Sequence, residues 1–254
     1  MLVYFKGEKI FNKNAILEKK VKDESKNMNN SNIYKSGYVI LIYFVMTQFL
    51  GIIGVQLLAK TGWYDIQRNQ QQAIQEILVH WELIGFLLTI GIIFLVYKKE
   101  WIKEPRLSIK LSKATCGWIL AGIVFVFLAQ MIGSFLDKSL FQLSTQSENT
   151  SSTVAAAVIS PIAIVSIVIL APLVEELVFR YATMNILMKK FKETGSIVIS
   201  ALFFAIMHFD FPFIFGYFCI GVVLAFVYKR SNQLLVSYIV HAVMNLIVLM
   251  LQII

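Results

Sequence analysis

The chain has 254 residues, of which 58% are hydrophobic and only 15% are charged. This composition excludes an ordinary soluble domain and indicates an integral membrane protein. The net charge of +8 does not indicate a nucleic-acid partner, because nearly all the basic residues lie in short polar segments between apolar runs.

A polar N-terminal segment, residues 1–36, is followed by a series of apolar runs. The first run begins too far along the chain, and is too long, for the apolar core of a cleavable signal, so we expect it to remain as a span. The runs are 37–59, 78–97, 116–136, 154–188, 195–209, 211–228 and 233–254. A membrane helix needs roughly 20 residues to cross a core of ~30 Å, so we predict an all-α, polytopic membrane helical bundle of about seven transmembrane helices. Residues 37–254 are expected to form a single transmembrane domain.

Basic and poorly basic segments alternate along the chain. Lys and Arg number eight before Gly37, six in 98–113 and three in 189–193, whereas 60–77 and 134–153 contain few. The positive-inside rule therefore predicts a cytoplasmic N-terminal segment and a C-terminus outside.

Two of the apolar runs have unusual lengths. Residues 154–188 must connect an outer loop to a basic inner one, so the run is interpreted as one long helix, kinked or interrupted at Pro161 and Pro172. The run 195–209 is short for a span and ends just before Pro212, so its helix is expected to end inside the membrane.

Ionisable residues gather in the apolar runs of the C-terminal half. Glu175, Glu176 and Arg180 share one helix, and His208 and His241 lie in two others. Each such group costs several kcal/mol in a bilayer, so together they mark a functional site. Arg180 follows Glu176 by four residues and can form an ion pair with it along one helix face, which leaves Glu175 free to face another helix.

The depths of these residues are compatible with a shared site. At about 1.5 Å per residue, Glu175, His208 and His241 fall within half a membrane thickness of one another. Asn245 lies one turn after His241 and shares its helix face. A carboxylate and a histidine can activate a water molecule, and a second histidine with an amide can stabilise an oxyanion. This equipment is typical of peptide hydrolysis.

Structural roles also fit some of these polar residues. Each histidine or the Glu–Arg pair alone could be structural. His80, beside Trp81 and Glu82, is predicted to be an interfacial anchor, and Asp210 a turn residue. The sequence contains no His-Glu-x-x-His zinc helix and no Gly-x-Ser-x-Gly elbow, which would have indicated other protease chemistries. Cys116 and Cys219 are interpreted as small hydrophobic residues.

The polar residues of the C-terminal half resemble the CPBP family (CAAX proteases and bacteriocin-processing enzymes, also called Abi). The family pattern is Glu-Glu-x-x-x-Arg, then Phe-x-x-x-His, then His-x-x-x-Asn or Asp, on successive membrane helices. The chain contains, in this order, Glu175-Glu176-Leu-Val-Phe-Arg180, Phe204-Ala-Ile-Met-His208 and His241-Ala-Val-Met-Asn245. The resemblance covers roughly residues 170–246, and it implies a catalytic core at about 154–254.

The resemblance also implies a role for each motif residue. Glu175 and His208 would activate the attacking water, and His241 and Asn245 would stabilise the oxyanion. Glu176 and Arg180 would support this arrangement. Members of the family are described both as metalloproteases and as metal-free glutamate proteases, so Glu175, His208 and His241 are candidate ligands for Zn²⁺ if a metal is used.

Two functions of different classes follow. The first is an intramembrane endopeptidase that hydrolyses a membrane-associated peptide or protein in the bilayer of a bacterial cell membrane. The second is a non-catalytic membrane protein, for bacteriocin immunity or for binding an ion or a partner. The Lys-, Asn- and Ile-rich composition is typical of low-GC bacteria, which makes a prenylated substrate less expected despite the family name.

Overall fold

The computed structural model describes residues 33–103, 105–107, 111–142 and 147–253. These residues form helices and connecting turns, and no strand occurs among them. The predicted all-α class is therefore confirmed. Most of the polar N-terminal segment lies outside the described residues; its last four residues already belong to the first helix.

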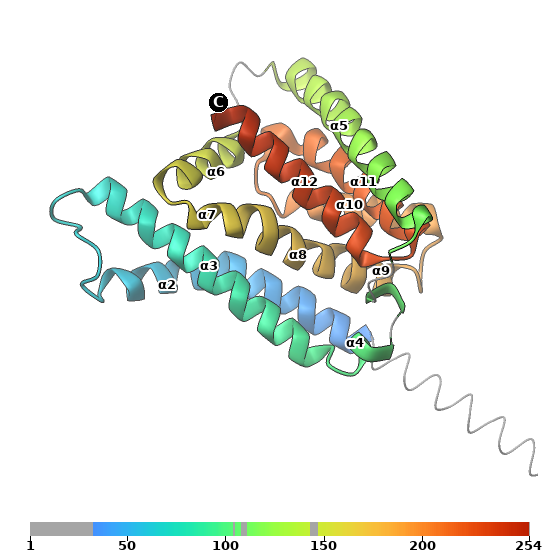
Figure 1. The fold of residues 1–254 in the computed structure, drawn as a ribbon, viewed down its shortest axis with the longest axis horizontal. Coiled ribbons are helices and arrows are strands. Elements are labelled where there is room, and N and C mark those ends of the chain that lie inside the picture. The colour runs from blue at the N-terminus through green and yellow to red at the C-terminus, as the bar shows by residue number, and fades with distance from the viewer. Residues whose placement is uncertain (1–32, 104, 108–110, 143–146, 254) are drawn as a thin grey trace, which may run out of the picture.

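The N-terminal half contains long helices joined by short connections (Figure 1). The first helix, Ile33–Thr47, passes through the π-helical turn η1 (Val45–Phe49) and bends by 42° before the next helix. The following elements are α2 (Leu50–Ala59), α3 (Gln70–Val96), α4 (Glu100–Lys103), the 3₁₀ turn η2 (Pro105–Leu107), α5 (Lys113–Phe141) and α6 (Glu148–Ile159).

The C-terminal half begins with a composite helix that changes its winding several times. It consists of α7 (Ile162–Val165), π-helical η3 (Ser166–Leu170), α8 (Ala171–Glu175), π-helical η4 (Glu176–Thr183) and α9 (Met184–Leu187). Three helices and one short 3₁₀ turn follow, namely α10 (Glu193–Ile206), η5 (Phe211–Phe213), α11 (Ile214–Ser231) and α12 (Leu234–Ile253).

All seven predicted runs are helical, and the polytopic bundle is confirmed. Among the described residues, however, five helices are long and apolar enough to cross a membrane, or six if the bent first pair counts as one span. The five are α3, α5, Ile162–Leu187, Phe211–Ser231 and α12. The predicted count of seven therefore exceeds what length and composition support, because the first run is bent and α10 is a shorter apolar helix.

The predicted long helix at 154–188 is divided in the structure. Helix α6 ends at Ile159, and Ser160 is extended, with φ −142° and ψ 113°. A residue before proline is driven out of the helical region by the proline ring, so Pro161 separates α6 from the composite helix. Pro172 does not end the composite helix, because it lies in the first turn of α8, just after the π-helical turn η3, where the regular hydrogen-bond ladder is already altered.

A close contact between α5 and α11 fixes the start of α11. A Cβ atom on Gly133 would lie 2.6 Å from the Cα of Gly216, so only glycine permits this approach. The buried carboxylate of Asp137 accepts hydrogen bonds from the backbone N–H groups of Phe215 (2.9 Å) and Gly216 (2.8 Å). These N–H groups at the helix N-terminus have no intrahelical partner, so Asp137 caps α11 from another helix.

Polar contacts link described parts of the basic segments to neighbouring helix ends. These contacts join helix ends that are far apart in the sequence: Lys35 with Glu100 (2.6 Å), Arg106 with Asn185 (2.7 Å), Arg230 with Glu193 (3.4 Å) and Gln233 with Thr115 (3.2 Å). This arrangement agrees with the alternation of basic and poorly basic segments.

The charge pattern predicts that Lys99 and Lys190 face the cytoplasm and Ser147 faces the exterior. Single-cysteine variants at these positions, made after replacing the two free cysteines Cys116 and Cys219, should show it in intact cells. A membrane-impermeant thiol reagent should label position 147 only. Labelling at position 190 from outside would refute the predicted orientation.

Candidate active site

A cavity of about 570 Å³ opens among helices from both halves of the chain. Four of the predicted site residues line it: Glu175 from α8, His208 from the turn after α10, and His241 and Asn245 from α12. The structure therefore brings together side chains from three separate sequence motifs. Glu176 and Arg180 do not line the cavity; they are fully buried behind it.

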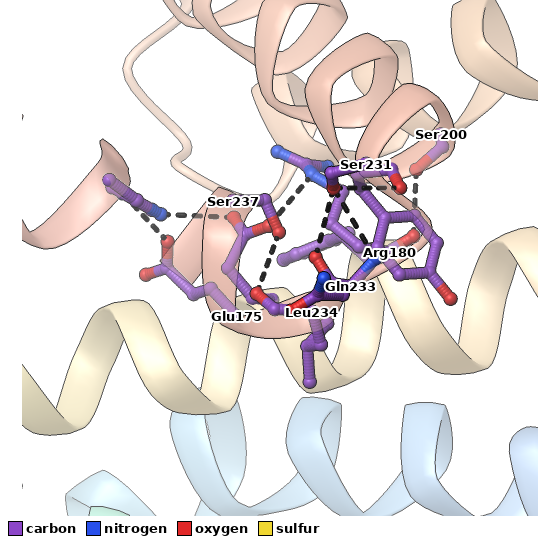
Figure 2. A network of polar contacts seen from close by, with 11 residues as sticks. Glu175, Arg180, Ser200, Ser231, Gln233, Leu234 and Ser237 are labelled. Atoms are coloured by element: carbon purple, nitrogen blue, oxygen red, sulfur yellow. Dashed lines mark hydrogen bonds and ion pairs between the residues drawn. The ribbon is translucent and has the colours of Figure 1, made fainter. Parts of the chain in front are cut away.

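His241 lies between the two adjacent glutamates. Its Nδ1 atom is 3.1 Å from Oε1 of Glu176, and its Nε2 atom is 3.7 Å from Oε2 of Glu175. An ionised carboxylate can only accept a hydrogen bond, so Nδ1 is the donor toward Glu176. Figure 2 shows Glu175 at one edge of this polar network and Arg180 further along it. Each glutamate of the motif thus contacts one ring nitrogen of His241.

The predicted ion pair between Glu176 and Arg180 is present. Nε of Arg180 is 3.2 Å from Oε2 of Glu176, and neither side chain is exposed. The guanidinium carbon also lies 4.7 Å from the ring centroid of Phe204, a favourable cation–π distance. The arginine therefore compensates a carboxylate that would otherwise be an isolated buried charge.

Two π-helical turns bring the motif residues to these positions, and side chains from other helices satisfy carbonyl groups within them. Ser200 on α10 donates a hydrogen bond to the carbonyl of Phe179 (2.8 Å), and Asn245 on α12 donates to the carbonyl of Ile167 (3.0 Å). Turns of this kind occur frequently at functional sites. They tie the composite helix to its neighbours through side chains as well as through packing.

The bond made by Asn245 has a cause in the sequence. In the η3 turn, the N–H of Ala171 donates to the carbonyl of Ser166, five residues earlier. The next bond in this register would run from residue 172 to Ile167, but residue 172 is a proline and has no N–H. Asn245 supplies the missing donor, which fixes the orientation of its side chain in the cavity wall.

His208 is held in one orientation by its neighbours. Its Nδ1 atom is 2.7 Å from the carbonyl oxygen of Phe204, which can only accept, so Nδ1 carries the hydrogen and Nε2 keeps a free lone pair. The ring stacks on Tyr217, with centroids 4.0 Å apart. Asn149 on α6 donates to the backbone carbonyl of His208 at 2.8 Å. The next residue, Phe209, has φ +53°, an uncommon conformation for an aromatic residue.

The predicted metal ligands are not assembled as a metal site. The described residues contain no group of three or more His, Cys, Asp or Glu side chains that could hold a metal ion. Both nitrogen atoms of His241 face carboxylates, and Nδ1 of His208 donates a hydrogen bond to the carbonyl of Phe204. Glu175, His208 and His241 therefore surround a shared space without converging on one point, and this arrangement fits a bound water better than a metal ion.

Sequence reasoning missed several residues of the cavity. Tyr217, Asn149 and Glu82 all line it, yet only Glu82 carried a signal, as an ionisable residue in an apolar run. His80, predicted to be an interfacial anchor, lies inside α3, because Asn69 caps this helix much earlier, and Nδ1 of His80 lies 3.1 Å from the hydroxyl of Tyr64. The polar residues before the apolar run extend this helix.

Comparisons with known proteins agree with the geometry. The family model described as "Type II CAAX prenyl endopeptidase Rce1-like" matches residues 149–247. The chain is 27% identical over 219 residues to "Putative membrane peptidase YdiL" of Bacillus subtilis (strain 168), covering 85% of this chain and 88% of that protein. It is 28% identical over 225 residues to "Membrane-embedded CAAX protease MroQ" of Staphylococcus aureus (strain USA300), covering 85% and 87%. No solved structure matches the chain significantly.

The matched segment contains every motif residue gathered around the cavity, and both relatives are aligned over most of their length. These matches support the resemblance to the CPBP membrane proteases that the three sequence motifs indicated.

Proposed function

We propose that the protein is an intramembrane endopeptidase that hydrolyses a peptide bond in a membrane-associated peptide or protein, with residues 154–254 as its catalytic core. The observation that carries this proposal is the convergence of Glu175, His208, His241 and Asn245 on one cavity. Ionisable groups are costly inside a membrane helix, and four polar groups from three motifs lining one cavity match the needs of hydrolysis.

Glu175 and His208 act on the attacking water. The free Nε2 lone pair of His208 accepts a hydrogen bond from the water and orients it, and the Glu175 carboxylate takes the proton as general base. The water oxygen then forms a bond to the carbonyl carbon of the substrate. Glu175 returns the proton to the amide nitrogen as the carbon–nitrogen bond breaks, which yields a carboxylic acid and an amine.

His241 and Asn245 stabilise the oxyanion that forms on the carbonyl oxygen. An amide group has two N–H donors, and Asn245 uses one of them on Ile167, which leaves the second for the oxyanion. Nε2 of His241 lies beside Glu175, so it reaches the same reacting group, and it donates to the oxyanion in the imidazolium form, in which both ring nitrogens carry a hydrogen. Donors that are fixed before the reaction supply more stabilisation than mobile ones. Glu176 and Arg180 act as positioning residues, because they hold the ring of His241.

A comparison of membrane-associated peptides from cells with the wild-type protein and cells with Glu175→Gln tests the proposal. Gln preserves the size of the side chain but cannot take a proton. At equal protein levels, cleaved fragments should be present with the wild type and absent with Glu175→Gln, and the uncut precursor should accumulate. Identical peptide profiles, with any phenotype preserved, would favour the non-catalytic binding protein instead.

A further inference from the structure

Glu82 is an ionisable residue of α3 that the proposed reaction does not use. No ionisable residue follows it in the rest of this helix, which is apolar to its end at Val96. A charged side chain facing lipid is costly, so such residues point toward protein or a wet cavity. Glu82 is accessible and lines the cavity that also contains Glu175 and His208. Phe86, one turn later, lines the same wall.

The cavity is acidic and lacks a compensating cation. Glu82 forms no hydrogen bond or ion pair with the residues that the structure describes, whereas Glu175 faces His241. None of the described residues lining the cavity is Lys or Arg. Glu82 and Glu175 line the same cavity, where two like charges would repel one another. Arg180 cannot neutralise the charge of Glu82, because it is buried in an ion pair with Glu176.

We infer that Glu82 is a subsite for a positively charged side chain, Lys or Arg, of the peptide that the cavity binds close to the bond to be cut. This inference rests on the proposed function. An ammonium or guanidinium group would pair with Glu82 and reduce the repulsion between Glu82 and Glu175. A cationic side chain should therefore bind in this cavity more tightly than a neutral or an anionic one.

The rest of the cavity wall fits a peptide rather than a small cation. It combines hydroxyl and amide side chains, which can bond to a peptide backbone, with apolar surface for neighbouring side chains. The hydroxyl and amide members include Gln130, Asn149, Thr150 and Thr153, and the apolar ones include Phe86 and Met244. A substrate that placed its terminal carboxylate here would be repelled.

The test uses a pool of synthetic peptides, each with an apolar segment and one Lys at a different position, and a matched pool with acetyl-lysine. Both pools are made with free and with acetylated N-termini. The purified protein is reconstituted in phosphatidylcholine vesicles, which carry no net charge to attract the peptides, and mass spectrometry follows each cleavage. A peptide with Lys at the favoured position should be cut about 10- to 100-fold more efficiently than its acetyl-lysine partner.

The variants assign this preference to one carboxylate. In Glu82→Gln the ratio of Lys to acetyl-lysine cleavage should fall to about 1, and Glu82→Lys should instead favour a peptide with Glu at that position. Glu76→Gln is the matched control, since Glu76 lies on the same helix outside the cavity and should keep the wild-type ratio. An unchanged ratio in Glu82→Gln would overturn the subsite. A preference that follows the free N-terminus alone would overturn the side-chain assignment.

Binding separates failure of the subsite from failure of the proposed function. Fluorescence anisotropy of the same labelled peptides requires no cleavage. If nothing is cut, but the Lys peptide binds more tightly than the acetyl-lysine peptide and Glu82→Gln removes the difference, the subsite stands and the protease proposal fails. If cleavage depends on Glu175 but neither cleavage nor binding depends on the Lys charge, the protease stands and the subsite fails.

Discussion

Glu175→Gln and His208→Asn are each expected to abolish turnover while leaving the folded protein intact. Glu175→Gln nearly preserves the size of the side chain but removes the group that takes the proton from water, and His208→Asn removes the Nε2 atom that orients the water. His208→Asn also removes the ring that stacks on Tyr217, so its thermal stability should fall slightly more than that of Glu175→Gln.

Asn245→Ala should be milder in rate. Loss of one oxyanion donor typically costs about 2.7–4 kcal/mol, or roughly 10²–10³ in kcat. The measurement is cleavage of a reconstituted substrate at matched protein levels. Glu76→Gln and His80→Asn serve as controls, because they make the same substitutions at residues that do not line the cavity. Both variants should cleave the substrate at the wild-type rate. Near-wild-type cleavage by both Glu175→Gln and His208→Asn would end the protease interpretation.

Arg180→Ala is expected to reduce stability and accumulation as well as activity. It leaves the fully buried carboxylate of Glu176 without its cation, and breaking a buried pair in this way typically costs about 3–5 kcal/mol. The double variant Glu176→Gln with Arg180→Met should recover part of the loss, because no charge is then stranded. Its activity should remain low, since the hydrogen bond that orients His241 is weakened.

Thermal unfolding in detergent and protein levels in membranes measure this effect. Arg230→Ala is the matched control: its ion pair with Glu193 joins side chains that are 52% and 38% exposed, and such pairs contribute about 0–1 kcal/mol. Arg180→Ala should therefore unfold at a clearly lower temperature than Arg230→Ala. Equal unfolding temperatures for these two variants would show that the buried pair is not what holds η4 in place.

The helices and the motif residues were predictable because charged residues are rare in apolar runs. Glu175, Glu176 and Arg180 stand out against Leu, Val and Phe, and the spacing of Glu176 and Arg180 is enough to predict their ion pair. Depth along each helix placed His208 and His241 near them. These inferences needed only helix geometry and the cost of burying charge.

The features that escaped prediction depend on tertiary structure. The start of α3 at Gln70 lies well before the apolar run, and hydropathy alone cannot locate such a helix end. The stacking of Tyr217 on His208 joins residues on different helices, and nothing in its local sequence distinguishes this tyrosine from others. The η3 and η4 turns arise where contacts from α10 and α12 satisfy the altered backbone, so no single segment encodes them.

The hydrogen bond from Asn245 to Ile167 makes positions 172 and 245 interdependent, although they lie on different helices. An alanine at position 172 would bring its own N–H group to the Ile167 carbonyl and release Asn245, which would then be free to rotate in the cavity wall. Conversely, removing Asn245 strands a buried carbonyl only while Pro172 is present. The residue at position 172 thus determines whether the Asn245 side chain is held in place, so substitutions at the two positions should be made and interpreted as a pair.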